Sequence, residues 1–130
     1  SGMCDYGRVM KSQTYQILAV DDVLLQNMTQ AIVEAVAPER VILFGSRAKG
    51  TARADSDIDF LVIKSEKFGP GHGRRQESAK VWWAISEFGV PADVLMYHLD
   101  DIDEWKNSPN HVIYRALEEG RVLYERSKAG

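Results

Sequence analysis

Apolar residues recur at helical spacing in three parts of the chain. Over residues 21–37 they lie three or four positions apart and Pro38 follows, which predicts an amphipathic helix that ends before the proline. The same spacing predicts helices over residues 76–88 and 111–119, each closed by a glycine. A short helical turn is expected over residues 100–105.

Short apolar runs rich in strand-forming residues predict four strands, over residues 41–44, 57–64, 92–97 and 121–125. Residues 46–54 suit a tight loop or a single helical turn, with Ser46 as its N-cap. The segment 65–73 is rich in glycine and has no apolar period, so we expect a mobile surface loop. The resulting element order favours a small α/β sheet flanked by helices.

The length of 130 residues favours one domain, which we place at residues 3–130 because Ser1 and Gly2 resemble the remnant of a cleaved tag. With 45% hydrophobic and 27% charged residues, the composition is that of a soluble globular protein. Cys4 is the only cysteine, and neither a membrane span nor a signal peptide is evident, so a cytoplasmic location is expected. The net charge of -3 argues against broad binding to nucleic acid.

Two aspartates at the start of a predicted strand carry the main chemical signal. Side chains alternate across a strand, so Asp57 and Asp59 project from the same face while Ile58 points into the core. Two adjacent carboxylates repel each other unless a cation lies between them, and Mg²⁺ prefers one or two carboxylates together with substrate phosphates. If the strand with Asp93 lies beside this one, three carboxylates could hold two metal ions about 4 Å apart, the arrangement used in phosphoryl transfer.

The turn after the first predicted strand supplies the second half of the candidate site. Glycine at position 45 lets the backbone approach a phosphate closely, and the Ser46 hydroxyl adds a donor to the exposed amides of the turn. Arg47 and Lys49 add positive charge there, although either is also consistent with a solvated side chain. We therefore assign Gly45, Ser46 and Arg47 as candidate nucleotide-binding residues.

Gly45-Ser46, ten intervening residues and then Asp57-x-Asp59 resemble the G-S-x10-D-x-D signature of the DNA polymerase β-like nucleotidyltransferases. The surrounding residues resemble the minimal nucleotidyltransferases, the MNT-domain proteins often encoded as antitoxins beside HEPN toxins. The similarity covers roughly residues 25–125, including Asp93 and the closing segment 117–124. It implies a mixed-sheet nucleotidyltransferase palm.

The resemblance also implies a site and a reaction. Asp57 and Asp59 would be ligands of two Mg²⁺ ions, and Asp93 the third acid, which helps to activate the acceptor hydroxyl. Gly45 and Ser46 would hold the β and γ phosphates. AMP would pass from ATP to that hydroxyl with release of pyrophosphate, and the acceptor would be a tyrosine of a HEPN-type toxin that the modification silences.

Each of these residues also has a purely structural interpretation. Taken alone, the paired aspartates would also fit a solvated acidic turn. Asp93 taken alone would also fit an acidic residue at the edge of a strand. The glycines fit neither a P-loop nor a dinucleotide fingerprint, because the required lysine and spacing are missing. Arg74 and Arg75 could reach a nucleotide, but a basic pair at a helix start is more typical of solvent-exposed residues. The three tryptophans are more typical of core or interface packing than of base stacking: Trp82, Trp83 and Trp105.

Two other functions use the same residues. The first is nucleotidyl transfer to a small molecule such as an antibiotic, which the short chain disfavours because such enzymes usually carry an additional helical domain. The second is a non-catalytic antitoxin that masks its partner by binding. Three mutually repelling carboxylates argue against pure binding, since a binder has no need to keep them together.

Overall fold

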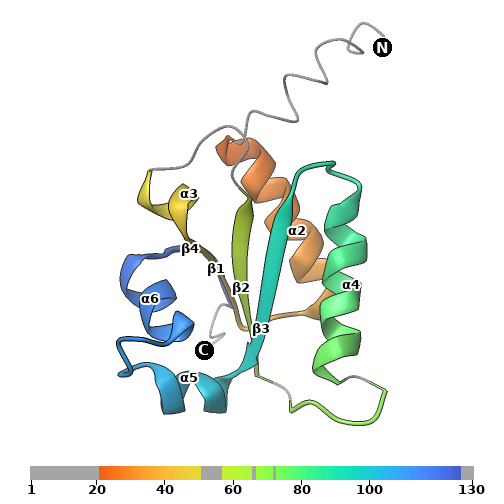
Figure 1. Cartoon of the computed structure of the whole chain (residues 1–130). Coiled ribbons are helices and arrows are strands. Elements are labelled where there is room, and N and C mark those ends of the chain that lie inside the picture. The colour runs from red at the N-terminus through yellow and green to blue at the C-terminus, as the bar shows by residue number, and fades with distance from the viewer. Residues whose placement is uncertain (1–20, 51–56, 66, 72, 127–130) are drawn as a thin grey trace, which may run out of the picture.

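A four-stranded sheet in the order β3-β2-β1-β4 lies at the centre of the molecule (Figure 1). The computed structural model describes residues 21–50, 57–65, 67–71 and 73–126. Its elements, in chain order, are α2 (Asp22–Val36), β1 (Arg40–Phe44), α3 (Ser46–Lys49), β2 (Ile58–Lys64), α4 (Arg74–Ser86), β3 (Ala92–His98), α5 (Leu99–Trp105), α6 (Val112–Glu119) and β4 (Arg121–Glu125).

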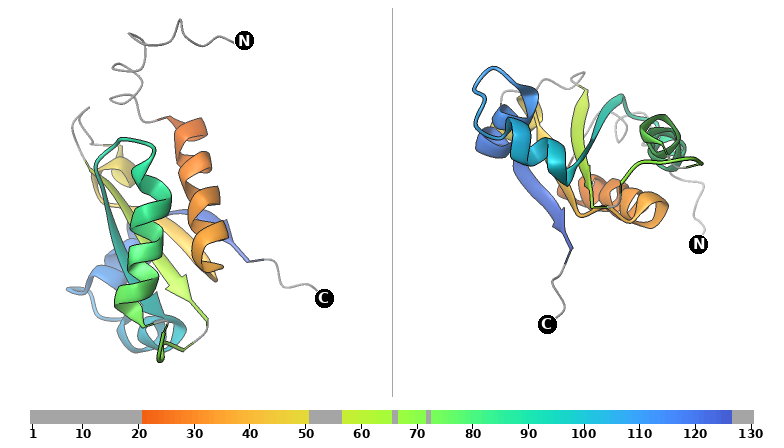
Figure 2. Two further views of the ribbon diagram at one scale, coloured as in Figure 1. Left: turned by 90° about the vertical axis from the view of Figure 1, so that its right-hand side faces the viewer. Right: turned by 90° about the horizontal axis from the view of Figure 1, so that it is seen from below.

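The sheet is mixed, as the resemblance implies. β1 pairs antiparallel with both β2 and β4, whereas β2 and β3 run parallel and are joined through α4. Helices α2 and α4 cover one face of the sheet and α5 and α6 the other, which the view from below shows most directly (Figure 2). The predicted fold class, a small mixed sheet flanked by helices, is confirmed.

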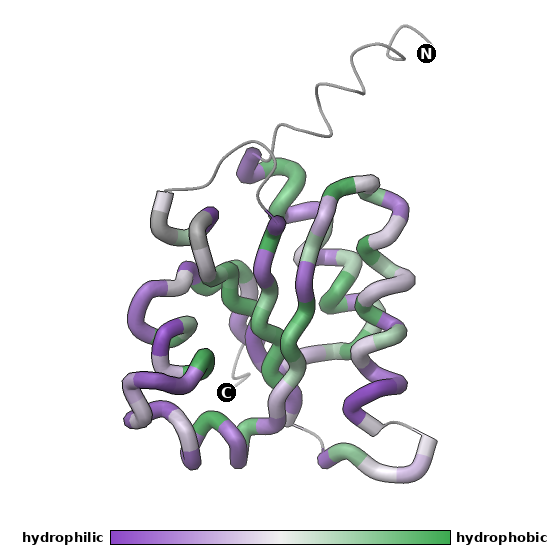
Figure 3. The backbone as a smooth tube through the Cα atoms, viewed as in Figure 1, coloured by the Kyte–Doolittle hydropathy of each residue, from purple (hydrophilic) through white to green (hydrophobic). Residues whose placement is uncertain are grey.

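Alternation along β2 divides the core between these two faces. Phe60 and Val62 pack toward α2 and α4, whereas Leu61 and Ile63 pack toward α5 and α6. All four side chains are fully buried. Hydrophobic residues accordingly follow one another most continuously along the central strands (Figure 3). Both faces of β2 are buried, so a shift of one residue in its pairing would exchange the two core surfaces.

The helix boundaries follow local capping chemistry. The Asp21 carboxylate accepts a hydrogen bond of 2.9 Å from the Leu24 amide and starts α2, and Ala37 ends it with a left-handed φ of 47°. Helix α4 begins at Arg74, two residues before the predicted start. There the Gln76 side chain accepts a hydrogen bond of 2.6 Å from the Gly73 amide.

Several sequence-based expectations need correction. Ser46 is the first residue of α3 rather than its N-cap, because the turn occurs at Gly45. Of the two roles expected for the tryptophans, core or interface packing, only the core role is wrong, because Trp82, Trp83 and Trp105 are exposed. Residues 1–20, which include Cys4, and residues 51–54 of the predicted turn lie outside the described residues. In the described part of the chain, no helix combines the length and apolar character that crossing a membrane would need.

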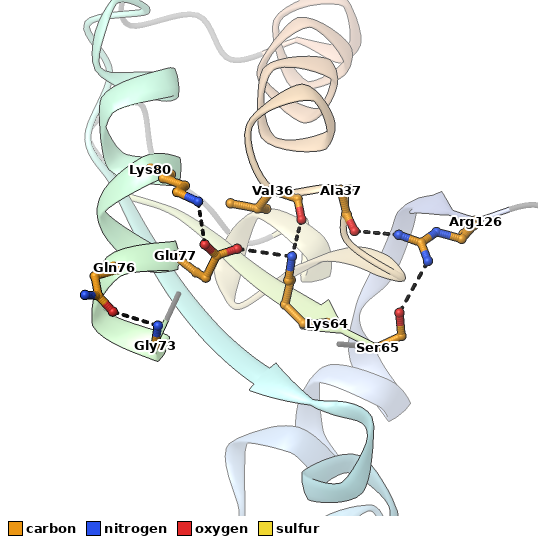
Figure 4. A network of polar contacts seen from close by, with 9 residues as sticks. All are labelled: Val36, Ala37, Lys64, Ser65, Gly73, Gln76, Glu77, Lys80 and Arg126. Atoms are coloured by element: carbon orange, nitrogen blue, oxygen red, sulfur yellow. Dashed lines mark hydrogen bonds and ion pairs between the residues drawn. The ribbon is translucent and has the colours of Figure 1, made fainter. Parts of the chain in front are cut away.

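A buried ion pair ties the end of β2 to the two helices behind the sheet (Figure 4). Lys64 Nζ lies 3.1 Å from Glu77 Oε1, and these side chains are only 5% and 6% exposed. Lys64 also donates to the Val36 carbonyl at the end of α2, and Lys80 Nζ lies 2.7 Å from Glu77 Oε2. Burial alone would raise the pKa of Glu77, but the hydrogen bonds from Lys80 and Lys64 outweigh it and lower that pKa.

Neutralising Glu77 alone should destabilise the fold, because Lys64 would remain buried without its counter-charge. We expect Glu77→Gln to lower the free energy of unfolding by about 3 kcal/mol in a urea titration. The exposed Glu87→Gln, one residue past the end of the same helix, should change it by less than about 0.5 kcal/mol. The double variant Lys64→Met/Glu77→Leu should recover most of the loss, and a double variant less stable than Glu77→Gln would contradict this explanation.

Candidate active site

The parallel pairing of β2 with β3 places two of the predicted acids side by side. Asp59 and Asp93 are register partners in this pairing, so they lie on neighbouring strands about 4.8 Å apart. Each lies two residues before a leucine that packs toward α5 and α6, Leu61 and Leu95, which places both carboxylates on that face of the sheet. The adjacency that the metal hypothesis required is therefore present, at the end of the sheet where β2 and β3 begin (Figure 1).

Asp59 is the most strongly affected member of the acidic group. Its pKa is raised above the ordinary value, first by burial and then by the negative charges of Asp93 and Asp57. Asp57, one residue before β2, and Asp93 are both exposed, whereas Asp59 is half-buried. The three carboxylates thus form one electrostatic group with Asp59 at its centre, and this group favours a bound cation.

Gly45 fits closely against the same carboxylate. It follows Phe44, the register partner of Asp59, and turns the chain with a φ of +77°. A Cβ atom at this position would meet Asp59 Oδ2 well inside van der Waals contact. Glycine lacks a Cβ atom and adopts a positive φ without strain, so it allows both this turn and the close contact with Asp59. These two requirements explain why position 45 is a glycine.

The arginines considered for the nucleotide site lie at two different ends of the sheet. Arg47 is half-buried in α3, the short helix that begins directly after Gly45. Arg74 lies at the other end of the sheet, where its guanidinium is 3.1 Å from Asp101 Oδ2 and 5.3 Å from the centre of the Tyr97 ring. Both Arg74 and Arg75 are exposed, as predicted, and Arg74 makes these contacts as a surface residue.

The metal assignment of Asp57, Asp59 and Asp93 stays a prediction. Among the described residues, no three His, Cys, Asp or Glu side chains are arranged to hold one metal ion together. The three acids interact through charge, which contributes to the raised pKa of Asp59. Their chemistry fits Mg²⁺, because hard carboxylate oxygens are the protein ligands that this ion uses together with phosphates.

Comparison with known families identifies the class of protein. The family model described as "Polymerase beta, Nucleotidyltransferase" matches residues 26–129. The chain belongs to this nucleotidyltransferase family, which confirms the family resemblance of the Gly45-Ser46 and Asp57-x-Asp59 pattern. No curated protein matches the sequence.

Solved structures to which this chain is similar include two toxin–antitoxin complexes. One, described as a toxin–antitoxin with AMP-PNP, has a TM-score of 0.50 and 19% identity and covers 78% of this chain and 74% of its own. A mutant of the toxin–antitoxin MntA-HpeT has a TM-score of 0.48 and 16% identity, with the same coverage. A putative nucleotidyltransferase from Sulfolobus solfataricus has a TM-score of 0.47 and 21% identity and covers 98% of this chain and 96% of its own. At 19% identity, the similarity to the first of these structures shows the fold alone.

The contact between Gly45 and Asp59 can be tested with a matched pair of glycines. Gly50 has nearly the same φ, +78°, but a Cβ added there would meet nothing within 4 Å. We expect Gly50→Ala to cost about 1 kcal/mol from backbone strain alone, and Gly45→Ala to cost about 0.5–1.5 kcal/mol more, because the Asp59 carboxylate must turn away from the added Cβ. Thermal or urea unfolding of both variants measures the difference.

A double-mutant cycle isolates the cause of the extra cost. In an Asp59→Ala background the clash partner is absent, so the cost of Gly45→Ala should fall to that of Gly50→Ala. An unchanged cost of Gly45→Ala in that background would show that the close packing of Gly45 against Asp59 is not what requires glycine.

Proposed function

We propose that this chain is a Mg²⁺-dependent nucleotidyltransferase that transfers AMP from ATP to a hydroxyl group of a partner protein. The observation that carries the proposal is the register pairing of Asp59 with Asp93, with Gly45 packed against Asp59. These residues bring a cation-seeking acidic group and a glycine turn to one end of the sheet. Membership of the nucleotidyltransferase family gives this arrangement its reaction class.

The acidic group is assigned the metal-binding role. Asp57 and Asp59 would be shared ligands of two Mg²⁺ ions and Asp93 the third ligand, since the raised pKa of Asp59 is the electrostatic state that a divalent cation relieves. When bound, Mg²⁺ would neutralise charge on the attacking and leaving oxygens during phosphoryl transfer. Without a cation, the cluster of like charges is unfavourable, and this cost is difficult to explain for a protein that only binds its partner.

The turn after β1 is assigned to the nucleotide. Gly45 lets the backbone amides of the turn approach the β and γ phosphates, the Ser46 hydroxyl adds a donor, and Arg47 adds a positive charge. The half-buried position of Arg47, two residues after Gly45, supports this role.

Asp93 is assigned to the acceptor. Its exposed carboxylate can take the proton from an incoming hydroxyl as that oxygen attacks the α-phosphorus. The bond from the α-phosphorus to the bridging oxygen then breaks, and pyrophosphate leaves with the bonding electrons. The products are an AMP ester of the acceptor and pyrophosphate.

A toxin protein is the proposed acceptor, so that the chain acts as an antitoxin. A neighbour in fold is described as a toxin–antitoxin with AMP-PNP, an ATP analogue, which supports both the nucleotide and the kind of partner. The resemblance to MNT-domain antitoxins points to a HEPN-type toxin and to a tyrosine hydroxyl. Nucleotidyl transfer to a small molecule remains the second candidate, since the three acids serve either acceptor equally well.

Transfer of labelled AMP to a HEPN-type toxin tests the proposal. With ATP and Mg²⁺, mass spectrometry should detect added AMP on the toxin with the wild-type chain. Asp57→Asn and Asp59→Asn should lower the rate by at least about 100-fold, because each removes a charged metal ligand. Asp103→Asn, an exposed acid on α5 whose side chain is 75% accessible, should leave the rate unchanged.

The outcome also separates the alternatives. If the wild-type chain and Asp59→Asn both silence the toxin without modifying it, the chain acts by masking its partner. If AMP is found on a small hydroxylated acceptor but not on the toxin, the acceptor assignment is wrong while the reaction class stands.

A further inference from the structure

The outer face of α4 carries the largest exposed apolar side chains of the described residues. Trp83 is 81% exposed and Trp82 43% exposed. The opposite side of the same helix is also apolar, because Val81 and Ile85 are buried against the sheet. A helix that is apolar on both sides of its axis is typical of one covered on both sides, so the tryptophan face is a candidate interface.

The exposed face has a regular shape. At 100° per residue, Ala79 and Ser86 fall on one line along the helix, and Trp82 and Trp83 lie on opposite sides of that line at nearly the same height. These four residues line an open, almost wholly apolar hollow of about 450 Å³. The face is therefore a shallow groove floored by two small residues and bordered by two large aromatic ones.

We propose that this groove is the interface of a homodimer in which the α4 helices of two copies pack antiparallel. Ala79 and Ser86 are one heptad apart, and the midpoint between them falls between Trp82 and Trp83. A two-fold axis at this midpoint places Ala79 opposite Ser86 of the second copy and each tryptophan beside its own counterpart. The small residues then allow the helices to approach to about 8–10 Å. The face is thus complementary to itself, which is the requirement for a two-fold interface.

The charges beside the groove agree with this alignment. Lys80 and Glu87 lie on the same side as Trp83, and the antiparallel pairing brings Glu87 of one copy next to Lys80 and Gln76 of the other. Lys80 is 52% exposed although it also contacts Glu77, so part of its positive charge faces outward. Opposite charges therefore meet on the tryptophan side, and the helix dipoles are also antiparallel.

The position of the groove favours a second copy over the acceptor protein. Helix α4 covers the sheet face opposite to the one that carries Asp59 and Asp93 (Figure 2). A molecule bound on the outer side of α4 is separated from these acids by the helix and the sheet, so it is poorly placed to present a hydroxyl to them. A dimer through α4 leaves the acidic face open in both copies.

The expected dimer is weak. Two tryptophans exposed to 81% and 43% contribute roughly 200–300 Å² per chain, and one helix face adds little more. Such an interface falls in the range of transient complexes, below about 1,200 Å² in total. We therefore expect a concentration-dependent dimer with a dissociation constant on the order of 10–100 µM.

Sedimentation of the full chain across about 1–500 µM, without a partner, measures the assembly directly. Trp83→Lys should weaken the dimer at least about tenfold, since it places two like charges at the centre of a two-fold interface. Val23→Lys makes the same chemical change at a 64% exposed apolar residue on α2 and should leave the dimer unchanged. Glu87→Lys should weaken it several-fold, while Glu104→Lys on α5 should not.

Cross-linking tests the orientation. In a Cys4→Ser background, an oxidised mixture of Ala79→Cys and Ser86→Cys chains should yield disulfide-linked dimers between the two variants, and neither variant alone should do so. Efficient cross-linking of Ala79→Cys chains to each other would contradict the antiparallel pairing. A wild-type chain that stays monomeric throughout the concentration range would overturn the proposal. So would a Trp83→Lys variant that dimerises normally but no longer binds a HEPN-type toxin, which would assign the groove to that partner.

Discussion

The parallel pairing of β2 with β3 is the constraint on which the candidate site depends. It brings Asp59 and Asp93, separated by a complete helix in the sequence, onto neighbouring strands as register partners. Buried side chains on both faces of β2 fix this register, because a slip of one residue would turn Leu61 and Ile63 toward the wrong helices. The packing of the core therefore holds together carboxylates whose charges favour separation.

The opposite end of β2 provides a second fixed point. Lys64 is bonded there to Glu77 on α4 and to the last turn of α2, so the helices behind the sheet are fastened where the strand ends. The acidic group at the start of β2 and the ion pair at its end differ in one respect. Opposite charges meet at the ion pair, whereas the charges of Asp93 and Asp57, which raise the pKa of Asp59, have the same sign as its own. Such groups of like charge are characteristic of sites that bind a ligand.

Much of this arrangement could be predicted from the sequence, because its signals are local. Periodicity located every strand to within one residue at each end, and β4 matched its predicted range of 121–125. The spacing from Gly45 to Asp57 and Asp59 identified the family. The hydrophobic periodicity also indicates that two charged residues are buried. Lys64 lies on the same strand face as Phe60 and Val62, and Glu77 lies on the same side of its helix as Val81 and Ile85. Two opposite charges on facing core surfaces predict a buried pair.

Other features depend on contacts that a single sequence does not encode. The rings of His98 and His111 start α5 and α6 by accepting hydrogen bonds of 3.0 Å through Nδ1, a cap that residue preferences do not anticipate. Trp82 and Trp83 were expected in a core or an interface, and only the packing of α4 showed that they face outward. The place of Asp93 beside Asp59 required the strand order, which depends on tertiary structure.

The central claim is that Asp59 and Asp93 lie close enough to repel each other. Carboxyl-carbon NMR titration of Asp59, with divalent cations removed, tests it most directly. In the wild-type chain, Asp59 should titrate above its ordinary value of 3.8, and Asp93→Asn should move its pKa downward, leaving only burial and Asp57 to raise it. Asp103→Asn should have no effect. An Asp59 pKa at or below the ordinary value, or one that Asp93→Asn leaves unchanged, would contradict the account.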